Sequence, residues 1–394
     1  MKRKRISTWV MAVAVLLVVS AIFSVNTYAS VSLSDVSSHW AKEQVNYLVQ
    51  KGVVSGYPDN TFKPQNNVTR AEFYRIINGV IGYTEVANIN YADVKQSDWY
   101  YNEVAKGVKA GYIFEKSGGN IEPNKPITRQ EVARIIGVTF GLTENVKAAE
   151  KFADAKQMAD WAKGHIGALQ DKKFISGYSD NTFKPEGKIT RAEAATMIKN
   201  ASGEIVNAGG QNKYEVQGNL FVNTSGVTLK DTTIKGNLYL AEGIGEGDVT
   251  LDNVTVDGEI LIRGGGKNSI TIKNSRTRSI VANKASGDVR IVIEGNGSIP
   301  KVDIRNGAVL VIREGSTVGT IAINAKADLE VQKGAVVRTA EANAAGITID
   351  AKGTIQTLKP TEALKLNGSN VEKGKDIKVD AGNITQPVEE FTAT

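Results

Sequence analysis

Residues 52–72 read GVVSGYPDNTFKPQNNVTRAE, and residues 177–193 repeat most of this phrase as GYSDNTFKPEGKITRAE. Residues 127–131, ITRQE, repeat its last part once more. A fixed internal period predicts three small homologous modules in tandem, and a repeated site favours a repeated ligand such as a polymer. The tryptophans that precede the three copies are 59 and 62 residues apart, and each lies thirty residues before an arginine: Trp40 and Arg70, Trp99 and Arg129, Trp161 and Arg191.

Each module carries the signals of two helices with a loop between them. In the first module, apolar residues at 41, 45, 48 and 49 share one helical face and predict a helix after Trp40. The Gly, Pro and Asn residues at 55–64 exclude helix there. A second helix is predicted at a capping box of Thr69 and Glu72. The other modules repeat this box as Thr128 with Glu131 and Thr190 with Glu193.

The arginine between the two capping residues is not explained by helix initiation. A cation in the first turn opposes the helix dipole. Beside the free N–H groups of a helix N-terminus, a guanidinium suits an anion, above all a carboxylate held by two hydrogen bonds. Two alternatives stay open. Each arginine could pair with a neighbouring carboxylate of the protein, and each tryptophan could belong to the core instead of forming a platform for a ligand.

The N-terminal residues predict export. Residues 2–5 are KRKR, residues 9–23 are almost wholly apolar, and Thr27-Tyr28-Ala29 offers small residues for cleavage. This pattern is typical of a cleavable secretory signal at 1–29, with the mature chain starting at Ser30. The alternative is an uncleaved membrane anchor, but the apolar run is shorter than the ~20 residues that a spanning helix needs.

Composition excludes several classes of protein. Without the four basic residues of the signal, 44 Lys and Arg face 42 Asp and Glu, so the electrostatic argument for nucleic-acid binding disappears. The chain has no cysteine, which excludes disulfides and thiolate chemistry. Its two histidines, His39 and His165, exclude a His-rich metal site. We therefore expect no metal and no cofactor.

Residues 31–200 closely resemble the S-layer homology domain family. The resemblance rests on Asp35-Val36, His39-Trp40-Ala41 and the phrase at 52–72, with its nearly complete third copy. It implies three modules, at 31–88, 89–148 and 149–203, that fold together as one all-α pseudo-threefold unit. It also implies that the grooves of this unit bind a secondary cell-wall polysaccharide linked to peptidoglycan, often through a pyruvate ketal on an amino sugar.

The resemblance also implies the residues of a carbohydrate-binding site. The arginines would hold the anionic group, and the tryptophans, aspartates and loop glycines would shape the grooves: Arg70, Arg129, Arg191, Trp40, Trp99, Trp161, Asp35, Asp93, Asp154, Gly56 and Gly177. The second module departs from this pattern, because Glu115 replaces the loop glycine and would repel an anion. We therefore expect its groove to be weak or purely structural. In the third module Lys173 replaces the glycine found at 52 and 111.

Helical spacing stops after Ala201, and short Val, Ile, Leu and Thr runs follow between Gly, Asn and Asp. Residues 229–240 align without gaps on residues 251–262, a shift of 22 residues. Apolar triplets continue this repeat to about residue 349. The pattern predicts a right-handed parallel β-solenoid at 210–360, with a β-sandwich as the alternative. A C-terminal tail is expected at 361–394. One corner of successive coils would carry a polar ladder of Asp231, Asn253 and Asn274.

These features predict an α + β multidomain protein, secreted to the cell wall or S-layer of the cell surface, that anchors a structural or adhesive solenoid without catalysis. The alternative is a wall-displayed polysaccharide lyase or hydrolase with its active site on the solenoid. Its candidate residues would be surface charges: Asp248, Asp252, Asp257, Asp288, Arg263, Lys273, Arg276 and Arg278. Self-assembly is a third possibility, because the ends of a solenoid expose strand edges.

Overall fold

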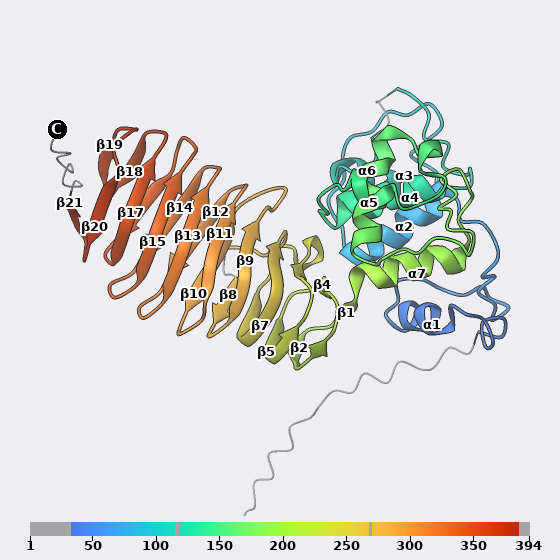
Figure 1. The fold of residues 1–394 in the computed structure, drawn as a ribbon, viewed down its shortest axis with the longest axis horizontal. Coiled ribbons are helices and arrows are strands. Elements are labelled where there is room, and N and C mark those ends of the chain that lie inside the picture. Colours follow the sequence, from blue (N-terminus) through green and yellow to red (C-terminus); the bar gives the residue numbers. More distant parts are fainter. Residues whose placement is uncertain (1–32, 115–117, 268–269, 386–394) are drawn as a thin grey trace, which may run out of the picture. The chain divides into compact units, whose positions relative to one another are not determined.

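The computed structural model describes residues 33–114, 118–267 and 270–385. The predicted secretory signal and Glu115 lie outside these residues. The α-helices of the described chain end at Ser202, and the part after it is built from strands, with one short 3-10 helix at Glu242–Ile244 (Figure 1). No described helix has the length and apolar character needed to cross a membrane. The helices are α1 (Lys42–Gln50), α2 (Arg70–Ile81), α3 (Tyr101–Lys109), α4 (Arg129–Thr139), α5 (Val146–Ala149), α6 (Asp160–Asp171) and α7 (Arg191–Ser202).

The three predicted capping boxes are present and start helices α2, α4 and α7. Each threonine hydroxyl accepts from the backbone N–H of the glutamate three residues on, and each glutamate accepts from the threonine N–H. The arginine of each repeated phrase is therefore the first residue of its helix. This places the three guanidinium groups at equivalent positions of the three modules.

A closed ring of backbone hydrogen bonds joins the segments that precede these helices. Val68 N–H donates to Ile189 O at 3.0 Å, Ile189 N–H to Ile127 O at 3.2 Å, and Ile127 N–H to Val68 O at 2.9 Å. All three side chains are fully buried. Each module thus gives one hydrogen bond and receives one, which is the pseudo-threefold arrangement expected of the helical unit.

The second half is a parallel β-solenoid, as predicted. One column of parallel strands runs through β5, β7, β8, β10, β12, β14, β16 and β18, and another through β4, β6, β7, β9, β11, β13, β15 and β17. Leu229 lies opposite Leu251, so the predicted shift of 22 is the pairing register. Parallel pairing of successive coils excludes the antiparallel β-sandwich.

The strands have the following bounds. The first seven are β1 (Glu204–Val206), β2 (Gly210–Asn212), β3 (Glu215–Val216), β4 (Leu220–Val222), β5 (Val227–Ile234), β6 (Leu238–Leu240) and β7 (Val249–Ile262). The next seven are β8 (Ile270–Lys273), β9 (Arg276–Ala282), β10 (Val289–Glu294), β11 (Ile299–Ile304), β12 (Ala308–Ile312), β13 (Thr317–Ile323) and β14 (Ala327–Val331). The last seven are β15 (Val336–Ala342), β16 (Thr348–Ala351), β17 (Thr354–Pro360), β18 (Leu364–Leu366), β19 (Ser369–Val371), β20 (Ile377–Asp380) and β21 (Asn383–Thr385).

The solenoid extends beyond the expected limits at both ends. Strand β1 starts before residue 210 and pairs with β4. At the other end, four strands occupy the stretch expected to be a tail: β18 continues the parallel stack, whereas β20 pairs antiparallel with β17. The chain reverses there, so antiparallel strands cover part of the last coil. Only residues 386–394 of the expected tail lie outside the described residues.

The helical unit and the first coils share one apolar cluster. The ring of Phe140 packs against Phe221 and Tyr239 at centroid distances of 5.4 and 5.6 Å, and both of the latter rings are buried. At β1, Ile205 N–H donates to the Tyr47 hydroxyl at 2.6 Å, and Lys51 Nζ donates to Ile205 O at 2.5 Å. Side chains of the helical unit therefore satisfy backbone groups of the first strand that an uncovered solenoid end would expose.

Asp231, Asn253 and Asn274 do lie at one corner of successive coils. All three have left-handed backbone angles, with φ values of 48°, 57° and 49°. The Asn253 amide donates to the Asp231 carboxylate at 2.7 Å. Asn and Asp tolerate this conformation better than other non-glycine residues do, which explains their recurrence at the corner.

Asn253→Ala is expected to lower the free energy of unfolding by about 1–3 kcal/mol, because it loses the side-chain hydrogen bond and strains the left-handed backbone. Asn253→Gly loses only the hydrogen bond and should cost clearly less. Urea unfolding of both variants, monitored by circular dichroism, tests the pair. Equal losses would show that backbone conformation does not select the residue at this corner.

Candidate functional site

Three surface grooves repeat around the helical unit, and each is built from all three modules. We number a groove by the module that supplies its loop. The first groove contains Gly56 and Tyr57 of module 1, Trp99 of module 2 and Arg191 of module 3. The second groove contains Phe114, Trp161, Arg70 and Glu131, and the third contains Tyr178, Trp40, Arg129 and Glu193. Their volumes are about 290, 330 and 390 Å³, which suits small-ligand sites.

The three tryptophans line the grooves and are not core residues. Trp40, Trp99 and Trp161 are 61%, 54% and 44% exposed, among the most exposed large apolar side chains in the described part of the chain. Exposed aromatic rings at equivalent places are apolar surfaces on which a flat ligand face can pack. The exposure contradicts the core interpretation of the tryptophans, and their role as a platform for a ligand stays a prediction.

Each arginine reaches the loop of another module. Arg191 Nε donates to Phe62 O and Arg129 Nε to Phe183 O, both at 2.8 Å, and Arg70 Nη1 donates to Ile121 O at 3.0 Å. The three contacts are equivalent under the pseudo-threefold arrangement. The guanidinium groups therefore help to hold the modules together as well as lining the grooves.

The N–H groups of the helix N-termini are not free, in contrast to the expectation from sequence. Arg191 N–H donates to Asn66 O at 2.9 Å, and the next N–H, of Ala192, donates to Pro64 O at 3.1 Å. The first two N–H groups of α2 and α4 donate to loop carbonyls of the neighbouring module in the same way. Since the threonine cap occupies the third N–H, an anion in a groove would depend on side chains alone.

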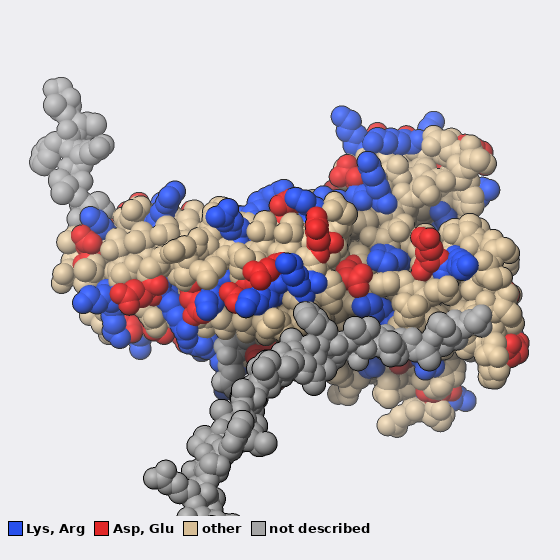
Figure 2. All heavy atoms as spheres, turned by 90° about the horizontal axis from the view of Figure 1, so that it is seen from below, with Lys and Arg blue, Asp and Glu red and all other residues tan. Residues whose placement is uncertain are grey.

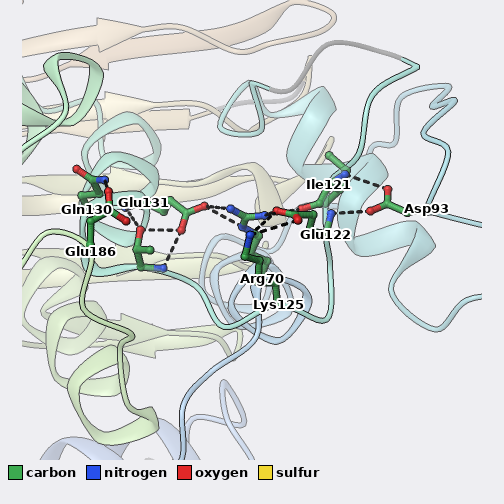
Figure 3. A network of polar contacts seen from close by, with 9 residues as sticks. Arg70, Asp93, Ile121, Glu122, Lys125, Gln130, Glu131 and Glu186 are labelled. Atoms are coloured by element: carbon green, nitrogen blue, oxygen red, sulfur yellow. Dashed lines mark hydrogen bonds and ion pairs between the residues drawn. The ribbon is translucent and has the colours of Figure 1, made fainter.

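The three arginines differ in their acidic partners. Arg70 Nη2 contacts Glu131 at 2.5 Å and its Nη1 contacts Glu122 at 2.9 Å, as Figure 3 shows. Arg129 contacts one carboxylate, Glu193, at 3.1 Å. Arg191 has no carboxylate partner among the described residues, and its Nη2 donates to Ser55 O at 3.1 Å. The alternative of internal ion pairs thus holds for two arginines and not for the third.

The ion pair in the third groove is tightly held. Burial raises the pKa of the Glu193 carboxyl, but the hydrogen bonds from Tyr178 and Thr190 and the charge of Arg129 outweigh it and hold the pKa below the usual value of 4.5. Tyr178 donates its hydroxyl proton to Glu193 at 2.6 Å. Burial, followed by this hydrogen bond, raises the pKa of Tyr178 to about 12.

The three aspartates fasten the loops and do not line the grooves. Asp154 accepts from the N–H groups of Phe183 and Lys184 at 2.8 and 2.7 Å. Asp35 and Asp93 make the same pair of contacts in the other modules. The aspartates therefore shape the grooves indirectly, by fixing the carbonyl groups that the arginines contact.

The two loop glycines line their grooves and also pack inward. A Cβ at Gly56 would lie 2.5 Å from Leu33, and a Cβ at Gly177 would lie 2.9 Å from Phe152. Lys173 has a left-handed φ of 59°, close to the 68° of Gly52, so it keeps the backbone of the glycine it replaces.

The sequence analysis missed two arginines that line the grooves and one glutamate that contacts a groove arginine. Arg75 lines the first groove with its guanidinium 6.0 Å from the Trp99 ring centre, and Arg134 lines the second, 5.2 Å from the Trp161 ring centre. Both arginines lie five residues after the arginine of the repeated phrase, and this recurrence could have revealed them. Glu122, the third, stands where the other modules have lysine.

None of the charged residues considered for a lyase lines the three grooves described above, although Arg278 Nη2 donates to Asp257 O at 3.2 Å. Asp257 pairs with Lys235 at 3.1 Å, and Asp252 lies opposite Lys273 on a neighbouring strand. Arg263 donates to Thr139 O of the helical unit. Among the described residues, no group of three or more His, Asp or Glu side chains could hold a metal ion.

The three grooves thus repeat one combination of an exposed aromatic ring, an arginine and loop backbone. Comparison with known families identifies the repeated unit. The model of the S-layer homology domain matches residues 32–73, 90–133 and 151–195, one match within each expected module. The chain therefore carries three S-layer homology domains, followed by a β-solenoid.

Known relatives share this segment. The exoglucanase XynX of Acetivibrio thermocellus is 37% identical over 174 residues, which cover 43% of this chain and 16% of that protein. The surface-layer 125 kDa protein of Lysinibacillus sphaericus is 27% identical over 78% of this chain and 26% of its own length. The S-layer protein of Bacillus thuringiensis subsp. finitimus is 27% identical over 92% of this chain and 45% of its own length.

The chain thus spans less than half the length of each of these relatives. The three domains and the S-layer relatives indicate a secreted protein associated with the cell wall at the cell surface.

Stability should depend on pH through Glu193. Because its pKa is lowered in the folded state, its stabilising effect is complete above about pH 4.5 and is lost as the pH falls through the folded-state pKa. Glu193→Gln should lower the free energy of unfolding by about 1–3 kcal/mol at pH 7 and by much less at pH 3. Urea unfolding at both pH values measures this difference.

Glu150→Gln is the matched control, because the Glu150 carboxylate is 60% exposed and 3.9 Å from Lys163. It should change stability little at either pH. A Glu193→Gln loss that is equally large at pH 3 would contradict an ionised Glu193 in the folded protein.

Proposed function

We propose that this protein is anchored non-covalently to the cell wall by a secondary cell-wall polysaccharide that binds in the grooves of the helical unit. The observation that carries the proposal is the threefold recurrence of a groove lined by an exposed tryptophan and by the arginine of another module. The three S-layer homology domains support it. A linear polymer with repeated units can engage several grooves at once, so modest individual affinities combine into firm attachment.

The chemistry of the grooves favours an acidic polymer, and we propose a pyruvate ketal on an amino sugar as the acidic group. A guanidinium can hold a carboxylate through two parallel hydrogen bonds, which adds geometric selectivity to charge. The tryptophan supplies an apolar face for the sugar ring. Attachment of this kind requires no bond to be made or broken, so the helical unit acts as a binding module and not as an enzyme.

In this proposal the helical unit attaches to the cell wall, and the solenoid is displayed at the cell surface with a structural or adhesive role. The S-layer protein of Bacillus thuringiensis subsp. finitimus aligns with 92% of the chain, so the likeness includes the solenoid region. The exoglucanase match covers 43% of the chain and gives no support to catalysis by the solenoid. Acidic and basic side chains are interspersed along the solenoid face seen in Figure 2, which suits a solvated surface.

Calorimetric titration of the full chain with purified wall polysaccharide tests the proposal. We expect binding to the native polymer and at least about a tenfold weaker affinity after mild acid removal of the ketals. Arg191→Ala should weaken binding to the native polymer by a similar factor. Trp99→Ala should weaken binding to both preparations, because its contribution is apolar.

Val86→Ala is a matched control for the loss of an exposed apolar side chain, since Val86 is 53% exposed and does not line the grooves. It should bind like the parent chain. Failure of the parent chain to bind either preparation would overturn the anchoring function. Equal affinity for the native and the ketal-free polymer would show that the grooves recognise uncharged sugar.

A further inference from the structure

Position 122 differs in charge from its two structural equivalents. Lys63, Glu122 and Lys184 each follow the residue whose carbonyl accepts from an arginine, and their φ values are 54°, 52° and 56°. The N–H group of each donates to the aspartate of its own module at 2.7 Å. The backbone is therefore the same in the three modules, and only the side chain distinguishes them.

The side chains at this position act differently on the grooves. Lys63 Nζ lies 4.0 Å from the ring centre of Tyr57, and Lys184 Nζ lies 4.1 Å from that of Tyr178, so both place a positive charge beside a groove. Glu122 instead contacts Arg70 at 2.9 Å and Lys125 at 3.0 Å (Figure 3). The hydrogen bonds from Lys125 and Arg70 hold the pKa of the Glu122 carboxyl below its usual value, so it is ionised at neutral pH.

The first groove is the most receptive to an anion. Neither Arg191 nor Arg75 has a carboxylate partner among the described residues. Glu72 also lines this groove, and its Oε2 accepts from the N–H and hydroxyl groups of Thr69 at 2.8 and 3.0 Å, as in the other two capping boxes. Unlike Glu131 and Glu193, it forms no ion pair with an arginine among the described residues. A carboxylate entering here would meet two guanidinium groups without displacing a partner.

In the other two grooves, the arginine of the repeated phrase is already paired with glutamates of the protein. In the second groove Arg70 is held by Glu131, which lines the groove, and by Glu122, which lies beside it. Arg134 also lines this groove, with its guanidinium 3.3 Å from the Phe114 ring centre. In the third groove Arg129 is buried and held by Glu193, and Thr196 stands where the first groove has Arg75. To bind an anion, Arg70 or Arg129 would have to leave an existing ion pair.

We infer that the three grooves bind different parts of one polymer: the first groove binds its carboxylate, and the second binds uncharged sugar units on Trp161. Glu122 adds to this difference, because it places a second carboxylate on Arg70 beside that of Glu131. The inference rests on the proposed function and specifies which part of the ligand each groove takes.

Reciprocal charge exchange tests the inference. Glu122→Lys should release Arg70 from one carboxylate, and Lys63→Glu should place a carboxylate beside Arg191. Both residues occur naturally at this left-handed position of the chain, so neither exchange should disturb the backbone. Lys184→Glu is the matched control, because the arginine of its groove is already paired. The ligand is a pyruvate-ketal hexosamine monosaccharide, titrated calorimetrically into the full-length chain alongside the same sugar without the ketal.

The parent chain should show one ketal-dependent site. Lys63→Glu should weaken that site by about tenfold to a hundredfold, and Lys184→Glu should leave it unchanged. Glu122→Lys should not by itself add a second ketal-dependent site, because Glu131 still holds Arg70 as Glu193 holds Arg129 in the third groove. Three equal ketal-dependent sites in the parent chain, or no effect of Lys63→Glu, would overturn the inference while the anchoring function stands. If the parent chain binds neither monosaccharide nor the wall polysaccharide, the proposed function fails, and the inference fails with it.

Discussion

The helical unit depends on the ring of three backbone hydrogen bonds among Val68, Ile127 and Ile189. Because each module both donates and accepts, no module can keep its position without the other two. The ring also sets the start of the three capped helices, so each arginine enters the loop of a neighbouring module. The grooves are therefore properties of the closed trio, and a single module would supply only part of one groove.

The same backbone supports three different electrostatic environments. The hydrogen bonds from loop N–H groups to the aspartates recur in all three modules with nearly the same lengths. The side chains that face the grooves vary: Arg191 lacks a carboxylate partner among the described residues, Arg129 has one and Arg70 has two. Duplicated modules thus keep the interactions that close the ring while the binding surfaces diverge.

Local signals made much of this fold predictable. Capping boxes act within four residues, and the coil-to-coil register of the solenoid follows from its repeat, so both could be found in the sequence. The partners of the arginines could not, because they depend on which module meets which loop. The occupied N–H groups of the helix N-termini were missed for the same reason. Strands β19–β21 were missed because they pair antiparallel and leave the repeat.

Whether the grooves hold the protein on the wall can be measured by co-sedimentation with purified cell-wall fragments. The full chain should sediment with fragments that retain their polysaccharide and stay in solution with fragments stripped of it. A folded Trp99→Ala, Arg191→Ala double variant should stay largely in solution in both cases. Sedimentation of this variant to the same extent as the parent chain would contradict the claim.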